Sequence, residues 1–447
     1  MPRDVPPRVR LGRRGTERRA CGLPWPDSLA DVSSPRPFTI GIVGGGQLAR
    51  MMYTASIALG VSVRLLAEGP DVSAAQIAGD VEVGDYTDPA TMGDFASRCD
   101  AITFDHEHVP TEILTELAES GVAVRPGPKA LVHAQDKAVM RTELSAMGVP
   151  CPQFALVADA DELVSFGDRV GWPVIAKAAR GGYDGKGVWK LDDADAARDF
   201  FASPAAGKVQ IVAEEFVDFA RELSALVVRS PSGQAVAYPI SESIQRDGVC
   251  NETVTPAPGL TEEQATGAQR LALDVAHRLG VVGVLAVELM ERSNGEVVVN
   301  ELAMRPHNTG HWTIDGAHTS QFENHLRAVL DLPLGDPSAR NRWTVMANVL
   351  GGTVADLPSA LLHSFARDRK LRVELYGKEV RPGRKVGHVN AYGDDLEQVR
   401  ARAHHAANYL MGREGHSEAD TEHVRTHGDL VGRTRAATGT VAPEGTR

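Results

Sequence analysis

The sequence predicts a mixed α/β and α+β protein of three domains, and three observations lead to this prediction. The chain has 447 residues, which is too long for a single hydrophobic core. Near its amino end a short apolar strand, a glycine-rich turn, an apolar helix pattern and a second strand follow one another, as in a βαβ unit of a parallel sheet. Later, two apolar runs flank Asn294-Gly295, which predicts an antiparallel hairpin.

Hydrophobic periodicity divides the chain into three predicted domains between two tails. Residues 38–135 are expected to hold strands at 38–43, 61–66 and 101–104, with helices at 48–59 and 112–118. Residues 136–333 are expected to hold helices at 137–147 and 262–279, strands at 174–177, 210–217 and 223–228, and the hairpin. Residues 334–411 form a small β-rich unit with strands at 344–350, 371–376 and 385–391 and a final helix at 395–411. Residues 1–37 and 412–447 lack apolar spacing, so we expect both tails to be disordered.

The composition restricts the classes of partner. A net charge of −12 argues against general binding to nucleic acid or to an anionic membrane, so a phosphate-bearing ligand needs a local basic cluster. No apolar run approaches the length of a membrane span. The four cysteines form no CxxC pair, which fits a reducing compartment. We therefore expect a cytoplasmic protein.

The predicted hairpin carries the most informative pair of residues. If Asn294-Gly295 forms a two-residue turn, Glu288 and Glu301 lie directly opposite each other on one face. Two carboxylates at that spacing repel unless a cation lies between them. Magnesium prefers oxygen ligands and commonly binds one or two carboxylates together with phosphate oxygens, so the hairpin predicts a nucleotide-phosphate site. The alternative is a slipped register with both glutamates in solvent.

The glycine-rich turn near the amino end has two interpretations. Gly44, Gly46 and Ala49 fit the pattern GxGxxA, and Glu68 follows the second strand where a dinucleotide-binding fold has its ribose-binding acid. A nicotinamide enzyme is therefore a rival hypothesis. The other interpretation is a tight turn that packs closely or binds a substrate phosphate, with Gln47 bonding the ligand.

A second glycine-rich segment follows a strand that ends in Lys177. The lysine suits nucleotide phosphates, and the glycines of residues 181–187 would let backbone N–H groups close over them. A flexible hairpin with a solvated lysine is the alternative. Further on, Glu214 could accept the exocyclic amine of adenine and Glu222 the ribose hydroxyls, although acids in a hinge usually face water.

Two basic segments complete the candidate site. Arg305 and His307 directly follow the hairpin, where they could stabilise charge on a transferring phosphoryl group. Zinc binding by His307 and His311 is disfavoured, because Pro306 and Gly310 oppose the helix it needs. The segment 376–385 places four cations around a Pro-Gly turn, which indicates either a phosphate site or a solvated basic turn.

Taken together, the motifs at 44–51, 103–109, 181–187, 300–311, 320–328 and 378–388 resemble the ATP-grasp superfamily. Within it they resemble the N5-carboxyaminoimidazole ribonucleotide synthetase family, from about Phe38 to Met411. This resemblance implies an ATP-grasp architecture with a Rossmann-like first domain, central ATP-grasp subdomains and a small C-terminal domain. It implies a ligase that uses ATP and Mg²⁺ to phosphorylate bicarbonate and then carboxylates the amino group of 5-aminoimidazole ribonucleotide in purine biosynthesis. It also implies a homodimer that binds neither nucleic acid nor membrane.

The resemblance also assigns roles by position. The expected ATP contacts are Lys137, Lys177, Gly182, Tyr183, Asp184, Gly185, Lys186, Gly187, Glu214, Glu215, Val217, Glu222, Gln245, Asn300 and Glu301. The expected metal ligands are Glu288 and Glu301, and the expected catalytic residues are Tyr183, Asp184, Arg305 and His307. The expected contacts of the ribonucleotide and carboxyphosphate are Gln47, Glu107, Tyr183, Lys186, Arg305, His307, Lys378, Arg384 and Lys385.

Three positions depart from the family pattern: Gln245 stands where a histidine is common, Asp105 where glutamate is usual, and Met304 where proline is frequent. None removes a catalytic charge. Three other hypotheses stay open. One is an ATP-grasp enzyme that activates a different acid, such as formate, or serves a biotin-linked carboxylation; the others are a nicotinamide oxidoreductase and a non-catalytic nucleotide-binding regulator.

Overall fold

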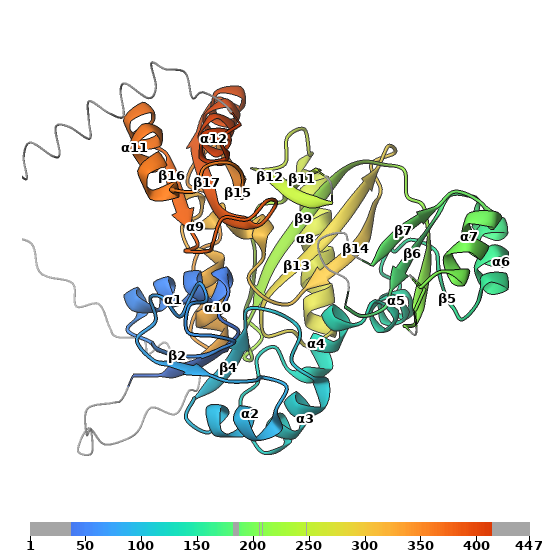
Figure 1. Cartoon of the computed structure of the whole chain (residues 1–447), viewed down its shortest axis with the longest axis horizontal. Helices are drawn as coiled ribbons and strands as arrows, with labels where there is room; N and C mark the ends of the chain where they lie inside the picture. The colour runs from blue at the N-terminus through green and yellow to red at the C-terminus, as the bar shows by residue number, and fades with distance from the viewer. Residues whose placement is uncertain (1–36, 182–186, 205, 208, 247, 414–447) are drawn as a thin grey trace, which may run out of the picture. The chain divides into compact units, whose positions relative to one another are not determined.

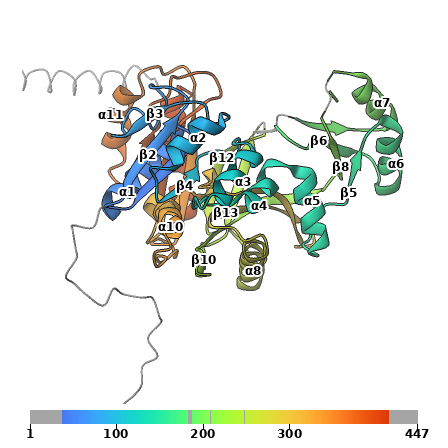
Figure 2. The same cartoon turned by 90° about the horizontal axis from the view of Figure 1, so that it is seen from below.

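The computed structural model describes residues 37–181, 187–204, 206–207, 209–246 and 248–413, and Figures 1 and 2 show the course of the chain. The strands of these residues form three sheets of four, nine and four strands. One sheet is parallel and two are antiparallel, so the predicted mixture of α/β and α+β structure is confirmed. The predicted tails lie outside the described residues, apart from Pro37, Gly412 and Arg413.

The first sheet is the predicted parallel one, with strand order β3-β2-β1-β4. Its strands are β1 (Thr39–Val43), β2 (Ser62–Ala67), β3 (Val81–Val83) and β4 (Ala101–Phe104). The helices of this region are α1 (Gln47–Leu59), α2 (Pro89–Ala96), α3 (Thr111–Glu119) and α4 (Pro128–Gln135). Helix α1 starts directly after the glycine-rich turn and ends at Gly60, whose φ of 64° suits a residue without a side chain. The turn therefore lies at the carboxyl end of β1, where parallel sheets place their ligands.

The second sheet is small and antiparallel, with strand order β5-β8-β6-β7. Its strands are β5 (Phe154–Val157), β6 (Val174–Ala178), β7 (Val188–Leu191) and β8 (Ile211–Glu215). Helix α5 (Lys137–Ala146) leads into it, and α6 (Ala160–Val170) and α7 (Ala194–Ala202) pack on it through an apolar cluster that includes Leu163, Phe166 and Phe200. Lys177 lies near the end of β6, as predicted for a lysine on a rigid strand.

The large sheet runs β14-β13-β9-β11-β12-β15-β17-β16, and β10 pairs with β9. Its strands are β9 (Phe219–Arg229), β10 (Ala235–Ala237), β11 (Ser241–Arg246), β12 (Val249–Thr255), β13 (Gly283–Arg292), β14 (Val297–Ala303), β15 (Trp343–Leu350), β16 (Arg372–Leu375) and β17 (Lys385–Gly393). The helical segments are α8 (Glu262–Arg278), the 3-10 helix η2 (Asn308–Gly310), α9 (Thr313–Gly316), α10 (Gln321–Val329), α11 (Leu357–Arg367) and α12 (Leu396–Met411). Because β15 pairs with β12, the C-terminal strands continue the sheet that contains the acidic hairpin.

The hairpin itself differs from the prediction in its turn but not in its key pair. The N–H of Arg292 donates to the carbonyl of Glu296 at 2.8 Å, so residues 293–295 form a three-residue loop and the predicted two-residue turn is wrong. Further along, Leu289 pairs with Val299 while Glu288 pairs with Glu301, which makes Asn300 an extra, bulged residue on β14. The longer loop and the bulge each shift the register by one residue, in opposite directions. The predicted pairing of Glu288 with Glu301 is therefore confirmed.

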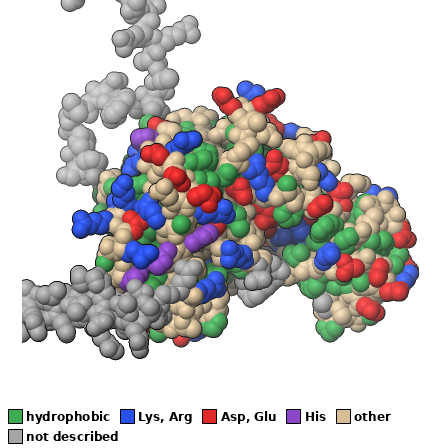
Figure 3. Space-filling model, turned by 90° about the horizontal axis from the view of Figure 1, so that it is seen from above, with side chains coloured by type: hydrophobic (Ala, Val, Ile, Leu, Met, Phe, Trp, Pro, Cys, Tyr) green, Lys and Arg blue, Asp and Glu red, His purple; other side chains and the backbone are tan. Residues whose placement is uncertain are grey.

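Two further observations concern the described part of the chain as a whole. No helix there is long and apolar enough to cross a bilayer. On the face drawn in Figure 3, acidic and basic side chains are interspersed, so phosphate recognition depends on local clusters of cations.

Candidate active site

The acidic hairpin presents two carboxylates, each with its own basic neighbour. The Glu301 carboxylate accepts a hydrogen bond of 2.6 Å from Nζ of Lys137, at the start of α5. The Glu288 carboxylate lies 3.2 Å from Nε2 of His307. His307 accepts the N–H of Thr309 at Nδ1, so its proton belongs on Nε2, from which it donates to Glu288. Burial raises the pKa of Glu288, but this hydrogen bond and nearby positive charges, among them Arg305, bring it below its usual value.

Lys177 reaches the same region from the small sheet. Its Nζ lies 2.8 Å from Glu214 and 3.2 Å from the side-chain oxygen of Asn300, the bulged residue of β14. Glu214 is 2% exposed, and its other oxygen accepts a 2.7 Å hydrogen bond from Arg141. Although burial raises the pKa of Glu214, the two cations lower it to about 2. The structure thus places this carboxylate in the interior, which differs from the cleft-facing position expected for an adenine contact.

The other predicted adenosine contacts lie between the two antiparallel sheets. Glu215 accepts from Arg292 at 2.6 Å and from Gln153 at 3.2 Å, so it links β8 to the end of β13. Val217 is buried against Met290 and Val298. These contacts hold the small sheet against the hairpin.

Glu222 lies on β9 near Glu288. Its Oε1 accepts a 3.3 Å hydrogen bond from Gln245, the residue that departs from the family pattern. Burial, together with the charge of Glu288, raises the pKa of Glu222 to about 7. The side chain is therefore partly protonated at neutral pH when no cation is bound.

We expect this proton to affect folding stability. The folded protein keeps it up to about pH 7 while the unfolded chain releases it near pH 4.5, so Glu222 makes stability fall as the pH rises through that window. Glu222→Gln should flatten this slope and be most stabilising, relative to the parent, above pH 7. Urea unfolding of the metal-free protein between pH 4.5 and 8 measures it, with the exposed Glu296→Gln as control. Equal slopes in the parent and Glu222→Gln would contradict the prediction.

Arg305 joins the hairpin to the parallel-sheet region. Its Nε donates to Glu107, in the loop after β4, at 2.8 Å. Burial lowers the pKa of Arg305, but the opposite charges of Glu107, Asp105 and Glu288 raise it above its usual value. A cavity of about 310 Å³ adjoins this ion pair, lined in part by Glu107, Thr111 and Arg180. Arg305, predicted to be catalytic, thus extends from the hairpin toward the first domain, whereas His307, also predicted to be catalytic, contacts Glu288 of the hairpin.

The glycine-rich turn is occupied by carboxylates of the chain itself. Gly45 N–H donates to Glu68 at 3.1 Å, and Gly46 N–H donates to the buried Asp105. A side chain at Gly44 would place its Cβ 2.0 Å from Asp105 at a φ of +100°. A dinucleotide fold binds its pyrophosphate to such N–H groups, so this arrangement argues against the nicotinamide hypothesis.

The basic turn of the C-terminal region, residues 376–385, forms hydrogen bonds to the parallel-sheet region through three consecutive residues. The carbonyl of Tyr376 accepts from Ser73 at 2.6 Å, that of Gly377 accepts from Gln76 at 2.7 Å, and Lys378 Nζ donates to Gln47. Burial, followed by the charge of Arg384, lowers the pKa of Lys378. The predicted contacts Gln47 and Lys378 are therefore brought together.

His311 lies deeper than His307. It is 1% exposed and stacks on His388, with ring centroids 4.8 Å apart. Burial lowers its pKa well below the usual value, so the ring is neutral. Nδ1 of His311 lies 3.3 Å from the side chain of Gln321, whereas Nδ1 of His307 bonds Thr309. The two imidazole rings therefore have different hydrogen-bond partners.

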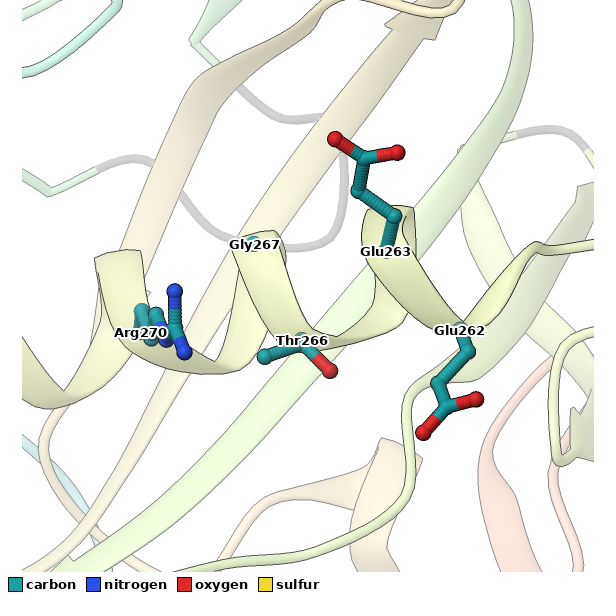
Figure 4. Close-up of a pocket in the computed structure, with 5 residues that line it drawn as sticks. All are labelled: Glu262, Glu263, Thr266, Gly267 and Arg270. Carbon is teal, nitrogen blue, oxygen red and sulfur yellow. The ribbon is translucent and has the colours of Figure 1, made fainter.

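A second hollow lies on the surface of α8, away from these groups (Figure 4). Its lining residues are Glu262, Glu263, Thr266, Gly267 and Arg270. All belong to one helix, so no group from another element converges on a ligand there.

Three family models match consecutive parts of the chain. A ribonucleotide synthetase preATP-grasp domain matches residues 38–135, an ATP-grasp domain 142–322, and a phosphoribosylaminoimidazole carboxylase C-terminal domain 344–402. The N5-carboxyaminoimidazole ribonucleotide synthase of Mycobacterium tuberculosis (strain H37Rv) is 54% identical over 374 residues, covering 83% of this chain and 87% of the relative. That of Corynebacterium ammoniagenes is 47% identical over 396 residues, covering 86% and 95%. The chain belongs to the N5-carboxyaminoimidazole ribonucleotide synthase family.

Solved structures of the family agree with this fold. The synthetase from Thermus thermophilus has a TM-score of 0.75 at 36% identity, covering 85% of this chain and 99% of its own. The Aspergillus clavatus enzyme in complex with ADP and 5-aminoimidazole ribonucleotide has a TM-score of 0.77 at 27% identity, covering 84% and 98%. The predicted three-part ATP-grasp architecture is confirmed.

Within this N5-carboxyaminoimidazole ribonucleotide synthase framework, the structure brings many of the predicted site residues together in two groups. The first group lies near the hairpin and consists of Lys137, Lys177, Glu222, Gln245, Glu288, Asn300, Glu301 and His307. The second group is the contact of Gln47 with Lys378, and Arg384 and Lys385 follow Lys378 on the same turn. Gly182, Tyr183, Asp184, Gly185 and Lys186 lie outside the described residues, and the carbonyl of Gly187 accepts from Ala178. Arg141 was not predicted. Arg141 follows Lys137 by four residues, so both lie on the same face of α5, and this spacing is a sequence signal from which Arg141 could have been predicted.

Proposed function

We propose that this protein uses ATP and bicarbonate to carboxylate the amino group of 5-aminoimidazole ribonucleotide through carboxyphosphate, in purine biosynthesis. The observation that carries the proposal is the ion pair of Arg305 with Glu107. Arg305 also interacts electrostatically with Glu288 of the hairpin and with Asp105, and Asp105 interacts in turn with Lys378, so the proposed ATP and ribonucleotide sites are linked through these charges. Relatives named for this reaction support the same conclusion.

We infer that Glu288 and Glu301 hold Mg²⁺ together with nucleotide phosphates. Two carboxylates on opposite strands, without a third acidic or histidine ligand forming a metal cluster among the described residues, fit a cation that takes its other ligands from phosphate and water. Bound there, the ion would neutralise charge on the transferred phosphoryl group. Lys137 and Lys177 then contribute positive charge from α5 and β6.

The chemistry requires two displacements. A bicarbonate oxygen forms a bond to the γ-phosphorus of ATP as the bond to ADP breaks. The ribonucleotide amine then attacks the carboxyl carbon, phosphate leaves, and the amine loses a proton. Arg305 and His307 would stabilise the anion between these steps, because Arg305 links the hairpin to Glu107 of the first domain and His307 lies beside Glu288. Roles for Tyr183, Asp184 and Lys186 stay predictions.

Lys378 provides a test of the ribonucleotide site. Lys378→Ala should raise the KM for the ribonucleotide roughly 10–100-fold, since a hydrogen bond to a charged group contributes about 1.5–3 kcal/mol. The KM for ATP should stay within about twofold. Arg381→Ala is the matched control, because Arg381 lies on the same turn but is exposed and bonded to Glu379. A change confined to ATP would place Lys378 in the other site.

The function itself is tested by measuring ADP release from magnesium-ATP and bicarbonate, with and without 5-aminoimidazole ribonucleotide. Strong stimulation that disappears when bicarbonate is depleted is the expected result. Absence of stimulation would overturn the proposed acceptor and favour an ATP-grasp ligase for another acid. The homodimer and the cytoplasmic location are likewise proposals from the family resemblance, and sedimentation analysis tests the first of them.

A further inference from the structure

Arg141 is a fully buried arginine whose side chain connects three elements around the metal pair. It lies on α5 and is 0% exposed. Its Nε donates to Glu214 of β8 at 2.7 Å, its Nη1 to the carbonyl of Val299 at 3.0 Å, and its Nη2 to the carbonyl of Asn300 at 2.6 Å. A charge so completely enclosed is tolerated only when its donors are satisfied, and here each of the three guanidinium nitrogens has an acceptor.

These contacts close a ring around the bulge of β14. Glu214 bonds Arg141 with one oxygen and Lys177 with the other. Lys177 in turn contacts the side chain of Asn300, whose carbonyl accepts from Arg141. The bulged residue is thus held at its backbone by one cation and at its side chain by another. Glu301 directly follows Asn300 on β14 and lies opposite Glu288.

The bulge decides which residue faces Glu288. The pairing of Leu289 with Val299 would, if continued without a bulge, place Asn300 opposite Glu288 and turn Glu301 away from it. The bulge moves Glu301 into that place. Arg141 donates to the carbonyls of Val299 and Asn300, the two consecutive residues at which the register of β14 shifts.

We propose that Arg141 is a positioning residue for the metal-nucleotide site. It keeps Asn300 in the bulge, so that Glu301 faces Glu288, and through Glu214 it holds Lys177 beside the same strand. The inference deepens the proposed function by assigning the support of its metal site. Arg141 is enclosed by protein and so acts on the metal site only through Asn300, Glu214 and Lys177.

The test is the gain in ADP affinity that Mg²⁺ produces, measured by isothermal titration with and without MgCl₂. Arg141→Met should reduce this gain by about 10–100-fold, the usual effect of removing support behind a metal ligand, while ADP affinity without Mg²⁺ changes far less. Arg141→Lys, which keeps the charge but loses the fork of donors, should give an intermediate loss. If Arg141→Met does not fold, Arg141→Lys still decides, because an unchanged gain in that folded variant would overturn the proposal.

Arg400→Met is the matched control. Arg400, on α12, bonds both oxygens of the buried Glu252 of β12 at 2.7 and 3.2 Å, and β9 and β11 separate β12 from the hairpin in the sheet. The Arg400→Met variant should have a lower melting temperature, but Mg²⁺ should increase its ADP affinity as much as it does in the parent. Equal losses in Arg141→Met and Arg400→Met would show that Arg141 serves only general stability and would overturn the proposal.

This measurement separates the inference from the proposed function. It needs neither bicarbonate nor the ribonucleotide, so a protein that fails the ADP-release assay can still show the Mg²⁺ effect of Arg141. Conversely, an intact gain in Arg141→Met, in a protein that passes the ADP-release assay, would overturn the inference and leave the function standing.

Discussion

Glu301→Gln should reduce magnesium-dependent turnover by about 10³-fold or more. The variant loses a charge from the pair that faces the nucleotide phosphates, and each 1.4 kcal/mol of lost transition-state stabilisation lowers the rate about tenfold. The fold should persist, because Glu301 is 41% exposed at its side chain and the amide can still accept the hydrogen bond from Lys137. Steady-state ADP release at increasing Mg²⁺ concentrations measures the effect.

Glu296→Gln is the control for that experiment. It makes the same chemical change on the same hairpin, at an exposed position in the turn region. Its turnover should equal that of the parent, and the far-ultraviolet circular dichroism of both variants should match it. Near-normal activity of Glu301→Gln at low Mg²⁺ would remove Glu301 from the metal site.

The hairpin shows how far local patterns predict structure. The apolar runs around Asn294-Gly295 predict an antiparallel hairpin, and a two-residue turn there would place Glu288 opposite Glu301. The structure has that pair, because the longer loop is compensated by the bulge. The three-residue loop and the bulge at Asn300 were not predicted. The bulge has contacts from outside the hairpin, since the carbonyl of Asn300 is held by Arg141 and its side chain by Lys177, residues more than 100 positions earlier. The binary pattern of apolar and polar residues along a strand does not show which distant side chains will contact it.

Glu214 and Glu68 show the same limit at other positions. Glu214 is expected from the sequence to accept the exocyclic amine of adenine, and Glu68 lies where a dinucleotide-binding fold would have its ribose-binding acid. In the structure Glu214 is buried against Arg141, 73 residues away, and Glu68 accepts the N–H of Gly45, 23 residues away. Sequence spacing identified carboxylates that matter but not the partners that hold them, because those partners meet only in the folded chain.

The departures from the family pattern have local consequences in the structure. Gln245 bonds Glu222, whose pKa is raised to about 7, so at this point an uncharged amide meets a carboxyl group that is partly protonated at neutral pH. Burial raises the pKa of Asp105, and its short side chain reaches the N–H of Gly46. Neither position removes a charge from the hairpin or from Arg305, which agrees with the expectation that the substitutions leave the catalytic charges in place.

Arg305→Ala should lower kcat about 10²–10³-fold, which is the usual effect of deleting one preorganised donor at a developing anion. Arg305 is the cation between Glu107 and the hairpin, and its removal would leave the carboxylates of Glu107, Asp105 and Glu288 to repel the anionic intermediate. ADP affinity in the presence of Mg²⁺ should change little, since the nucleotide contacts predicted for Lys137 and Lys177 stay in place.

Arg305→Lys separates charge from geometry. Lysine keeps the positive charge but cannot donate to Glu107 and to a second anion in one plane, so we expect an intermediate loss of kcat. Single-turnover measurement of carboxylated ribonucleotide, alongside ADP release, distinguishes the two displacements. A variant that still releases ADP but forms little product would show that Arg305 holds carboxyphosphate for the amine. If Arg305→Ala forms product at the parental rate, the charge that stabilises the intermediate must come from elsewhere, and Lys385 is the next cation to test because its charge also lowers the pKa of Glu288.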